Sequence, residues 1–333
     1  MRTLLISDLH LGIGRRHAVL ECPRPRERLL AALEGIDRLV LLGDTIELLE
    51  GDRARSLEVA GPLLRALGER VEEIVLVPGN HDRPLISRWL RTRRAPLQID
   101  TAVPLEATPV LARVSGWLAR AAVSVRYPGV WLGAGVWATH GHYLDRHLLP
   151  YSSWGMTRGL LWRPTDERAR PEQYERSPRG SARGRRPAWA HLPLELARAA
   201  TMPAARRHLL RPEMAPLTGS VLGFQMRRAS LPALGRVVDR LGVEADTVIF
   251  GHVHRLGPLA GDDPAQWRGP AGSPDLYNTG SWIYEPLLLH GACAPHPYWP
   301  GGAVLLDDGQ PPRAIGLLDD LTAAELHGAR RRR

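Results

Sequence analysis

Lysine is absent from the 333-residue sequence, so the net charge of +9 is built from 44 arginines against 35 acidic residues. The only cysteines are Cys22 and Cys293, which excludes a disulfide framework and leaves room for one bridge at most. No uninterrupted apolar run approaches the roughly 18 residues that a membrane-spanning helix needs. The apolar run near the N-terminus stops before Asp8, too early for a signal-peptide core. These absences predict a cytoplasmic protein with reduced thiols.

The positive charge is concentrated in the middle of the chain. Residues 143–242 contain 18 arginines and 8 acidic residues, whereas the rest of the chain contains 26 arginines and 27 acidic residues. Residues 163–187 are dense in arginine, proline, glycine and serine, which is typical of a mobile, solvated stretch. We expect an anionic partner for the central segment, and the alternative is a solvated basic face.

Short apolar strands alternate with amphipathic helices along the rest of the chain. We predict strands at residues 4–7, 38–42, 73–77, 135–139, 247–250, 276–283 and 303–306, and helices at 25–33 and 55–67. Thr108 and Pro109 are typical of a helix start, and the apolar spacing predicts that this helix continues to Val125. Further helices are expected at 192–200, 204–210 and 232–241.

This pattern predicts one catalytic domain with an insertion, because a 44% hydrophobic content is enough for one large core. The catalytic domain is predicted to comprise residues 1–142 and 243–325. Residues 143–242 are then an arginine-rich helical insertion or lid, and residues 326–333 form a basic tail.

Five polar clusters follow predicted strands, at the ends where open α/β sheets place their sites. Carboxylates, an amide oxygen and imidazoles are ligands for hard or borderline divalent metals, and no thiolate is among them. Because alternate residues of a strand share a face, Asp8 and His10 can reach one ion, and so can His252 and His254. The clusters are Asp8-Leu9-His10, Gly43-Asp44, Gly79-Asn80-His81-Asp82, His140-Gly141-His142 and Gly251-His252-Val253-His254.

Each cluster alone is explained more simply as a turn, a helix cap or a buried histidine. Five such clusters in one order, each after a predicted strand, are not explained in this way. The order resembles the signature of calcineurin-like metallophosphoesterases. That resemblance implies an α/β fold, a four-layer αββα sandwich with two mixed β-sheets and a largely helical insertion.

The resemblance also implies two divalent ions, for which Mn²⁺, Fe²⁺ and Zn²⁺ are all suitable. A hydroxide held between them would attack phosphorus. The implied ligands are Asp8, His10 and His254 for one ion and Asn80, His140 and His252 for the other, with Asp44 bridging.

Four further residues are candidates for roles beside the ligands, His81 and Asp82 from the same comparison and His142 and Arg255 from their positions next to predicted ligands. His81 resembles the family's catalytic histidine, which protonates the leaving oxygen or stabilises the transition state, and Asp82 would orient it. His142 is a candidate for substrate contact or for a supporting role behind the ligands. Arg255 is a candidate for holding phosphate, and its alternative is a solvated arginine.

Residues 7–11, residues 43–47 and the long insertion resemble the UDP-2,3-diacylglucosamine pyrophosphatase branch, in which a helical lid covers acyl chains. That branch usually has arginine where this chain has His81, so monoesters, diesters and pyrophosphates all stay open as substrates. The insertion could serve as a lid over a lipid- or nucleotide-linked phosphate. Together with the helix of Arg113, Trp117 and Arg120, it could instead contact an anionic membrane.

Two other functions stay open. The central arginines could bind nucleic acid, which would make the protein a nuclease or a nucleic-acid-binding phosphodiesterase. A non-catalytic scaffold would keep the metal site and show affinity without turnover. The presence of every expected ligand type favours an enzyme.

Overall fold

The computed structural model describes residues 1–14, 17–133, 135–147, 168–175, 229–270, 272–289 and 291–326. The chain divides into two compact units. The first comprises Met1–His142, Val243–Glu285 and Cys293–Arg333, and the second comprises Tyr143–Gly242 and Pro286–Ala292. The sequence-based domain boundaries remain a prediction.

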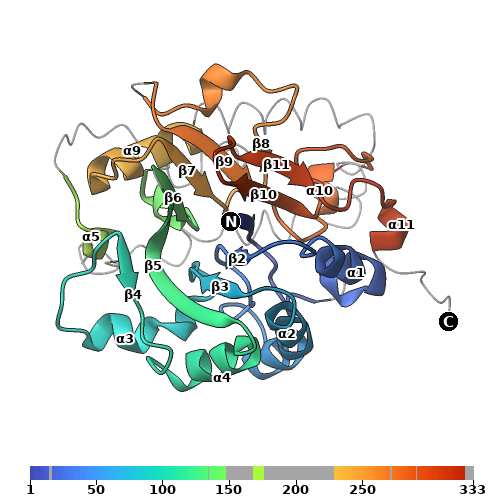
Figure 1. The fold of residues 1–333 in the computed structure, drawn as a ribbon, viewed down its shortest axis with the longest axis horizontal. Coiled ribbons are helices and arrows are strands. Elements are labelled where there is room, and N and C mark those ends of the chain that lie inside the picture. The colour runs from blue at the N-terminus through green and yellow to red at the C-terminus, as the bar shows by residue number, and fades with distance from the viewer. Residues whose placement is uncertain are drawn as a thin grey trace, which may run out of the picture. The chain divides into compact units, whose positions relative to one another are not determined.

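The first unit is built on a mixed β-sheet (Figure 1). Among the described residues, eleven strands are hydrogen-bonded in the order β11-β10-β1-β2-β3-β5-β6-β7-β9-β8, and β4 pairs with β5. The strands are β1 (Arg2–Ile6), β2 (Arg38–Leu41), β3 (Glu73–Leu76), β4 (Asp100–Ala102), β5 (Ala122–Gly133), β6 (Val136–Thr139), β7 (Thr247–Phe250), β8 (Leu256–Gly257), β9 (Asp275–Thr279), β10 (Gly302–Asp307) and β11 (Arg313–Gly316).

The long strand β5 joins the two halves of this sheet. Its first part, Ala122–Val125, pairs in parallel with β3, and its last part, Gly129–Gly133, pairs antiparallel with β6. The predicted α/β class is therefore confirmed as a mixed fold with a large mixed sheet. Because the pairing is continuous through β5, the finer arrangement of two separate sheets in four layers remains a prediction.

The predicted helices of the first unit are present as α1 (Pro23–Ala31), α2 (Arg53–Gly68) and α4 (Pro109–Leu118), whereas α3 (Ser87–Thr92) and α11 (Ala323–Leu326) were not predicted. Helix α4 begins as expected, since the side chain of Thr108 accepts a hydrogen bond from the Leu111 amide. It ends at Leu118, and Val125 lies in β5 instead, so the predicted extension was wrong. The other helical segments of this unit are η1 (Val19–Glu21), η2 (Arg83–Leu85) and η8 (Pro264–Trp267).

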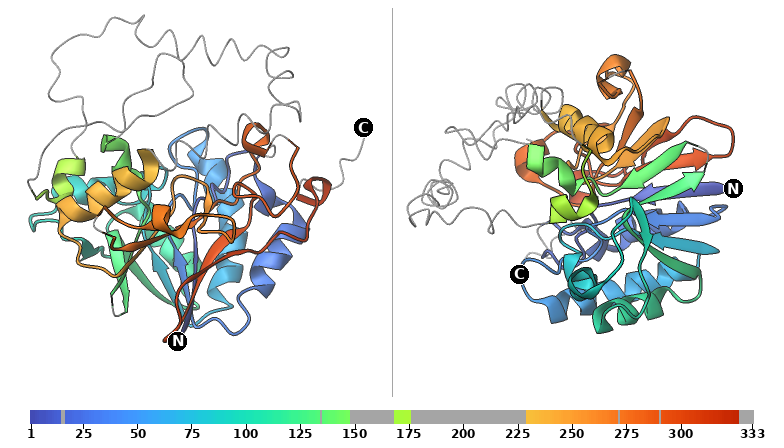
Figure 2. Two further views of the ribbon diagram at one scale, coloured as in Figure 1. Left: turned by 90° about the horizontal axis from the view of Figure 1, so that it is seen from above. Right: turned by 90° about the vertical axis from the view of Figure 1, so that its left-hand side faces the viewer.

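The core lies between the two halves of the sheet. Helices α2 and α4 cover the outer side of β2, β3 and β5 (Figure 1, and Figure 2, right). One buried cluster draws on strands from both sides of β5, so these strands pack face to face across it. Its members are Leu5, Val40, Leu42, Val75, Val77, Val130, Ala138, Ile249 and Val304. This packing brings together the loops that follow β1, β2, β3, β6 and β7.

The second unit is described in part. Helix α9 (Leu231–Leu241) confirms the helix predicted at 232–241 and ends at Gly242, whose φ of 65° is left-handed. Residues 171–175, inside the stretch predicted to be mobile, form the short helix α5 (Pro171–Glu175). This unit also contains α10 (Pro286–Leu289) and most of η3 (His142–His147). The predicted helices at 192–200 and 204–210 lie outside the described residues, as does the tail after residue 326.

Candidate metal centre and catalytic histidine

Five of the seven predicted ligands lie on strained backbone just beyond the strands. Strand β1 ends at Ile6 and β7 ends at Phe250, so the expectation that the ligand pairs sit within strands is wrong. In the described part of the chain, the non-glycine residues with positive φ are all predicted ligands: Asp8 (54°), His10 (43°), Asp44 (50°), His252 (69°) and His254 (59°). Such conformations are costly and cluster at functional sites.

These loops gather the donor atoms into overlapping groups. Asp8, His10 and His254 form one group, and Asp44, His140 and His252 form another. A third group, of His10, Asp44 and the predicted catalytic His81, overlaps both. The predicted pair His252 and His254 is therefore divided between two groups, which agrees with the family resemblance and not with shared strand spacing.

Short distances connect the donors within and between these groups. His254 Nε2 lies 3.1 Å from Asp8 Oδ1, and His140 Nε2 lies 3.2 Å from Asp44 Oδ2. Asn80 Oδ1 lies 3.1 Å from His140 Nε2, which adds the predicted amide ligand to the second group. Asp44 Oδ2 is also 3.8 Å from His10 Nε2, so this carboxylate stands between the groups.

Contacts behind the ligands fix which imidazole nitrogen faces the centre. His140 Nδ1 donates to the Leu42 carbonyl at 3.0 Å, and His10 Nδ1 donates to Glu47 Oε2 at 3.1 Å. Both rings therefore turn Nε2 toward the cluster, where its lone pair would bind an ion.

Two buried atoms support a cation in this place. Asp8 Oδ1 and His10 Nε2 have no hydrogen-bond partner in the part of the chain that the structure describes. A buried polar atom without a partner is costly, and a bound cation removes that cost. Carboxylate, amide and imidazole donors also suit Mn²⁺, Fe²⁺ or Zn²⁺. The residues present therefore fit the implied divalent ions.

The pKa shifts of two carboxylates in this cluster also favour a bound cation. Burial opposes ionisation of Asp8, but the charge of the adjacent His254 prevails and the pKa of Asp8 falls to about 2. The pKa of Asp44 is also well below its usual value, because His140 outweighs burial. Two ionised carboxylates are thus held in a buried place, where a positive charge stabilises them.

Glu47 connects the cluster to the predicted catalytic histidine. Its side chain is 1% exposed, and Oε2 lies 2.7 Å from His81 Nδ1 in addition to its contact with His10. Burial lowers the pKa of His81, but the hydrogen bond to Glu47 and the charges of Asp44 and Glu47 raise it overall. The main chain of His81 is fixed as well, since its amide donates to Asp44 Oδ1 at 2.8 Å.

Asp82 was predicted to orient His81, and its contacts are with backbone instead. Its carboxylate is fully buried and accepts hydrogen bonds from the amides of Thr45 (3.0 Å), Ile46 (2.9 Å) and Gly79 (3.4 Å). Burial and the charge of Asp44 raise the pKa of Asp82 to about 6. Asp82 thus connects the loop after β2 to the loop after β3. Its catalytic role remains a prediction.

The two candidate substrate contacts are placed differently. His142 lies next to the centre, with its ring 5.5 Å from that of His140 and its Nε2 3.3 Å from the Tyr127 hydroxyl. Arg255 forms an ion pair with Asp262, including an Nη1–Oδ2 distance of 2.9 Å, and stacks 5.3 Å from the Trp267 ring. Its guanidinium is already engaged, so phosphate binding by Arg255 remains a prediction without support from these contacts.

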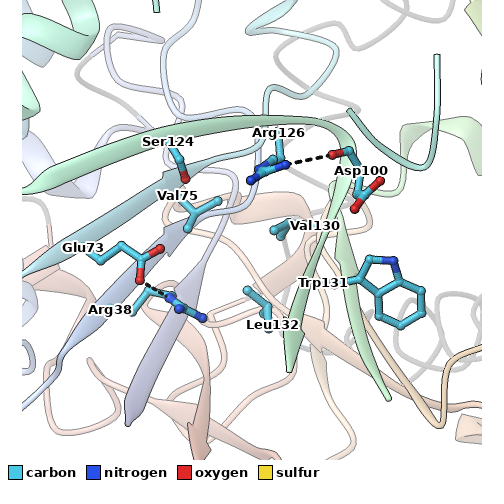
Figure 3. A pocket seen from close by; sticks show the side chains of 9 residues that line it. All are labelled: Arg38, Glu73, Val75, Asp100, Ser124, Arg126, Val130, Trp131 and Leu132. Atoms are coloured by element: carbon cyan, nitrogen blue, oxygen red, sulfur yellow. Dashed lines mark hydrogen bonds and ion pairs between the residues drawn. The ribbon is translucent and has the colours of Figure 1, made fainter. Parts of the chain in front are cut away.

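A cavity of about 250 Å³ elsewhere in the first unit has none of this chemistry (Figure 3). It opens where β2 and β3 begin, whereas the candidate centre lies beyond their other ends. Arg38 and Glu73 in its wall pair with each other at 2.6 Å, so these charges are already compensated. No predicted ligand lines it.

Sequence reasoning missed several supporting residues. Glu47 lies three positions after Asp44, between the apolar residues Ile46, Leu48 and Leu49. A buried acid in an apolar run needs a partner, so this pattern was the available signal that Glu47 supports the site. Ser7 and Thr279 also support the centre, as described below, and nothing in their local sequence indicated it.

The comparison with protein-family models agrees with this geometry. The family model for calcineurin-like phosphoesterases matches residues 1–256. No curated protein matches the chain. Among solved structures, the chain is similar to phosphopantetheinyl hydrolase (PptH) from Mycobacterium tuberculosis, with 17% identity over 89% of this chain and 93% of that one. The TM-score is 0.32, so this likeness carries no argument about substrate. On the family match and its coverage, the chain belongs to the calcineurin-like phosphoesterase family.

Proposed function

We propose that the protein hydrolyses a phosphate ester or pyrophosphate bond with two divalent metal ions. The observation that carries this proposal is the meeting of the five strand-end loops around the unpartnered Asp8 Oδ1 and His10 Nε2. Asp8, His10 and His254 would hold one ion, and Asn80, His140 and His252 the other, with Asp44 between them. When bound, such ions lower the pKa of a water and stabilise the oxygens of an in-line displacement.

His81 is proposed to supply the proton for the leaving oxygen. Its Nδ1 is held by Glu47, which leaves Nε2 for the substrate. Because the pKa of His81 is raised, the ring stays protonated to a higher pH than an ordinary histidine does. With a side chain 19% exposed, the ring is accessible to a substrate that enters from solvent.

Two classes of substrate are proposed. A lipid-linked or nucleotide-linked phosphate is compatible with the basic insertion predicted from the sequence, and a nucleic-acid substrate is the competing proposal. In the described helices no segment is long and apolar enough to cross a membrane.

A membrane contact through α4 gains no support from the surroundings of its tryptophan. Arg65 and Arg113 lie 5.5 Å and 5.1 Å from the Trp117 ring, so guanidinium groups already occupy positions over it. An interfacial tryptophan would instead keep its ring for lipid.

The test is phosphate release in the presence of Mn²⁺ from p-nitrophenyl phosphate, bis-p-nitrophenyl phosphate and a UDP-linked glycolipid. Each assay includes the His81→Ala variant, with circular dichroism as the control for folding. Turnover that is lost in His81→Ala supports the proposal, and the preferred substrate separates monoester, diester and pyrophosphate chemistry. A folded protein that binds metal without turning over any substrate would favour the scaffold alternative.

A further inference from the structure

One carboxylate of the candidate centre is held by a chain of hydroxyl groups. Ser7 precedes Asp8 directly, is completely buried, and donates its hydroxyl hydrogen to Asp8 Oδ2. The Thr279 hydroxyl lies 2.6 Å from the Ser7 hydroxyl and is also fully buried. Thr279 is the last residue of β9, so the chain connects segments 272 positions apart.

The number of available hydrogens determines which hydroxyl group donates in each of these hydrogen bonds. An ionised carboxylate only accepts, so the single hydrogen of Ser7 Oγ goes to Asp8. Ser7 Oγ must then accept, and the hydrogen of Thr279 Oγ1 goes to it in preference to the Phe250 carbonyl at 3.3 Å. Consecutive hydrogen bonds of this kind polarise and strengthen one another.

As a consequence, the two carboxylate oxygens of Asp8 have different partners. Oδ2 accepts from Ser7 and, at 3.0 Å, from the His252 amide. Oδ1 is left without a hydrogen bond from the described residues and lies 3.1 Å from His254 Nε2. The hydroxyl chain thus turns one oxygen away from the centre and presents the other to it.

The space around this contact is closed. A Cβ atom on Gly251 would lie 2.7 Å from Asp8 Oδ2 and would also collide with the Ser7 hydroxyl. Asn278 fixes the same loop, since its side-chain amide donates to the Gly251 carbonyl at 2.7 Å. The rotamer of Asp8 therefore has little freedom as long as the hydroxyl chain is intact.

We propose that Ser7 and Thr279 are positioning residues for the ion held by Asp8, His10 and His254, and not for the ion held with Asn80, His140 and His252. This inference rests on the proposed two-ion centre. Among the ligands of the second ion, His140 is oriented by the Leu42 carbonyl, and His252 meets the hydroxyl chain only through its backbone amide, which donates to Asp8 Oδ2. Loss of the hydroxyl chain should weaken one ion and spare the other.

The test is calorimetric titration of metal-free protein with Mn²⁺, using Thr279→Val, which keeps the shape and removes the hydroxyl. We expect one of two binding steps to weaken by about 10–100-fold, the usual effect of removing a partner behind a ligand. Thr279→Ser should restore it, and Ser7→Ala should weaken the same step. In a His254→Ala background, Thr279→Val should cause no further change in the remaining step.

Thr139→Val is the matched control. Thr139 is likewise buried at the end of a strand and directly precedes a ligand, His140, but its hydroxyl donates to the Pro128 carbonyl at 2.8 Å. Unchanged affinities in Thr279→Val, equal weakening of both steps, or the same result in Thr139→Val would overturn the inference. A wild-type protein that binds fewer than two ions would refute the two-ion proposal, and the inference with it.

Discussion

Replacing Glu47 by glutamine should separate metal binding from proton transfer. In the wild type, Oε1 accepts hydrogen bonds from the amides of Leu49 (3.1 Å) and Glu50 (2.8 Å) and lies 2.9 Å from His81 Nδ1. Oε2 lies 3.1 Å from His10 Nδ1 and 2.7 Å from His81 Nδ1. Backbone amides can only donate, so the single side-chain oxygen of the introduced glutamine must take the Oε1 position. Its NH2 group then faces both imidazoles.

Each histidine responds differently to this change. His10 must move its hydrogen to Nε2 to avoid two facing donors, which removes the lone pair that would bind metal. We therefore expect an apparent Mn²⁺ affinity about 10–100-fold lower. His81 keeps the oxygen at the Oε1 position but loses the negative charge of Glu47, which helps to raise its pKa, and we expect kcat to fall by about 10²-fold or more even at saturating Mn²⁺.

The assay is kcat/KM for p-nitrophenyl phosphate as a function of Mn²⁺ and of pH. A general acid is active below its pKa, so activity should decline as pH rises through the pKa of His81. Lowering that pKa in Glu47→Gln should move the decline to lower pH. Glu50→Gln is the control for charge without contact, because Glu50 is exposed and, among the described residues, its side chain has no hydrogen bond to either histidine, while its charge helps to raise the pKa of His81. It should leave the Mn²⁺ affinity unchanged and move the pH profile less than Glu47→Gln does. A Glu47→Gln enzyme with wild-type Mn²⁺ affinity and an unmoved pH profile would refute this reasoning.

Three further outcomes are expected. Chelation of divalent ions should abolish turnover and lower the melting temperature, since bound ions stabilise the folded state, and added Mn²⁺ should restore both. Asp82→Asn should reduce the free energy of unfolding by about 1–3 kcal/mol in urea titrations, because an amide group would face the amide of Thr45 or Ile46, with a folded population that still turns over substrate. Gly251→Ala should lower Mn²⁺ affinity measured by calorimetry, because the added methyl group would displace Asp8; unchanged affinity would show that the loop can relax.

Local sequence was sufficient to predict where the chemistry lies. Strands β2, β3, β6 and β7 were expected within about one residue of their observed ends, because a buried strand is a short apolar run bounded by polar residues. The polar clusters at those ends could be read directly for metal-binding chemistry. The start of α4 was predicted for the same reason, since the cap and the proline act within one helical turn.

The course of β5 shows where local reasoning ended. Leu118, Ala121 and Val125 fit a helical face as well as they fit a turn followed by a strand. The strand conformation is favoured because the edge of β3 supplies hydrogen bonds to Ala122–Val125. Such pairing depends on residues about 50 positions away, which no window of sequence contains.

The sequence by itself determined the ligand types, their order and their places after the strands, because these depend on side-chain chemistry and short-range periodicity. The grouping of His252 and His254 was given differently by strand spacing and by the family resemblance, and the tertiary structure placed them in different groups. Only the tertiary structure showed that Glu47 contacts two histidines and that Thr279 lies against Ser7. The physical reason is that these contacts join loops far apart in the chain, and their geometry follows from the packing of the two halves of the sheet and from the left-handed backbone at the ligands.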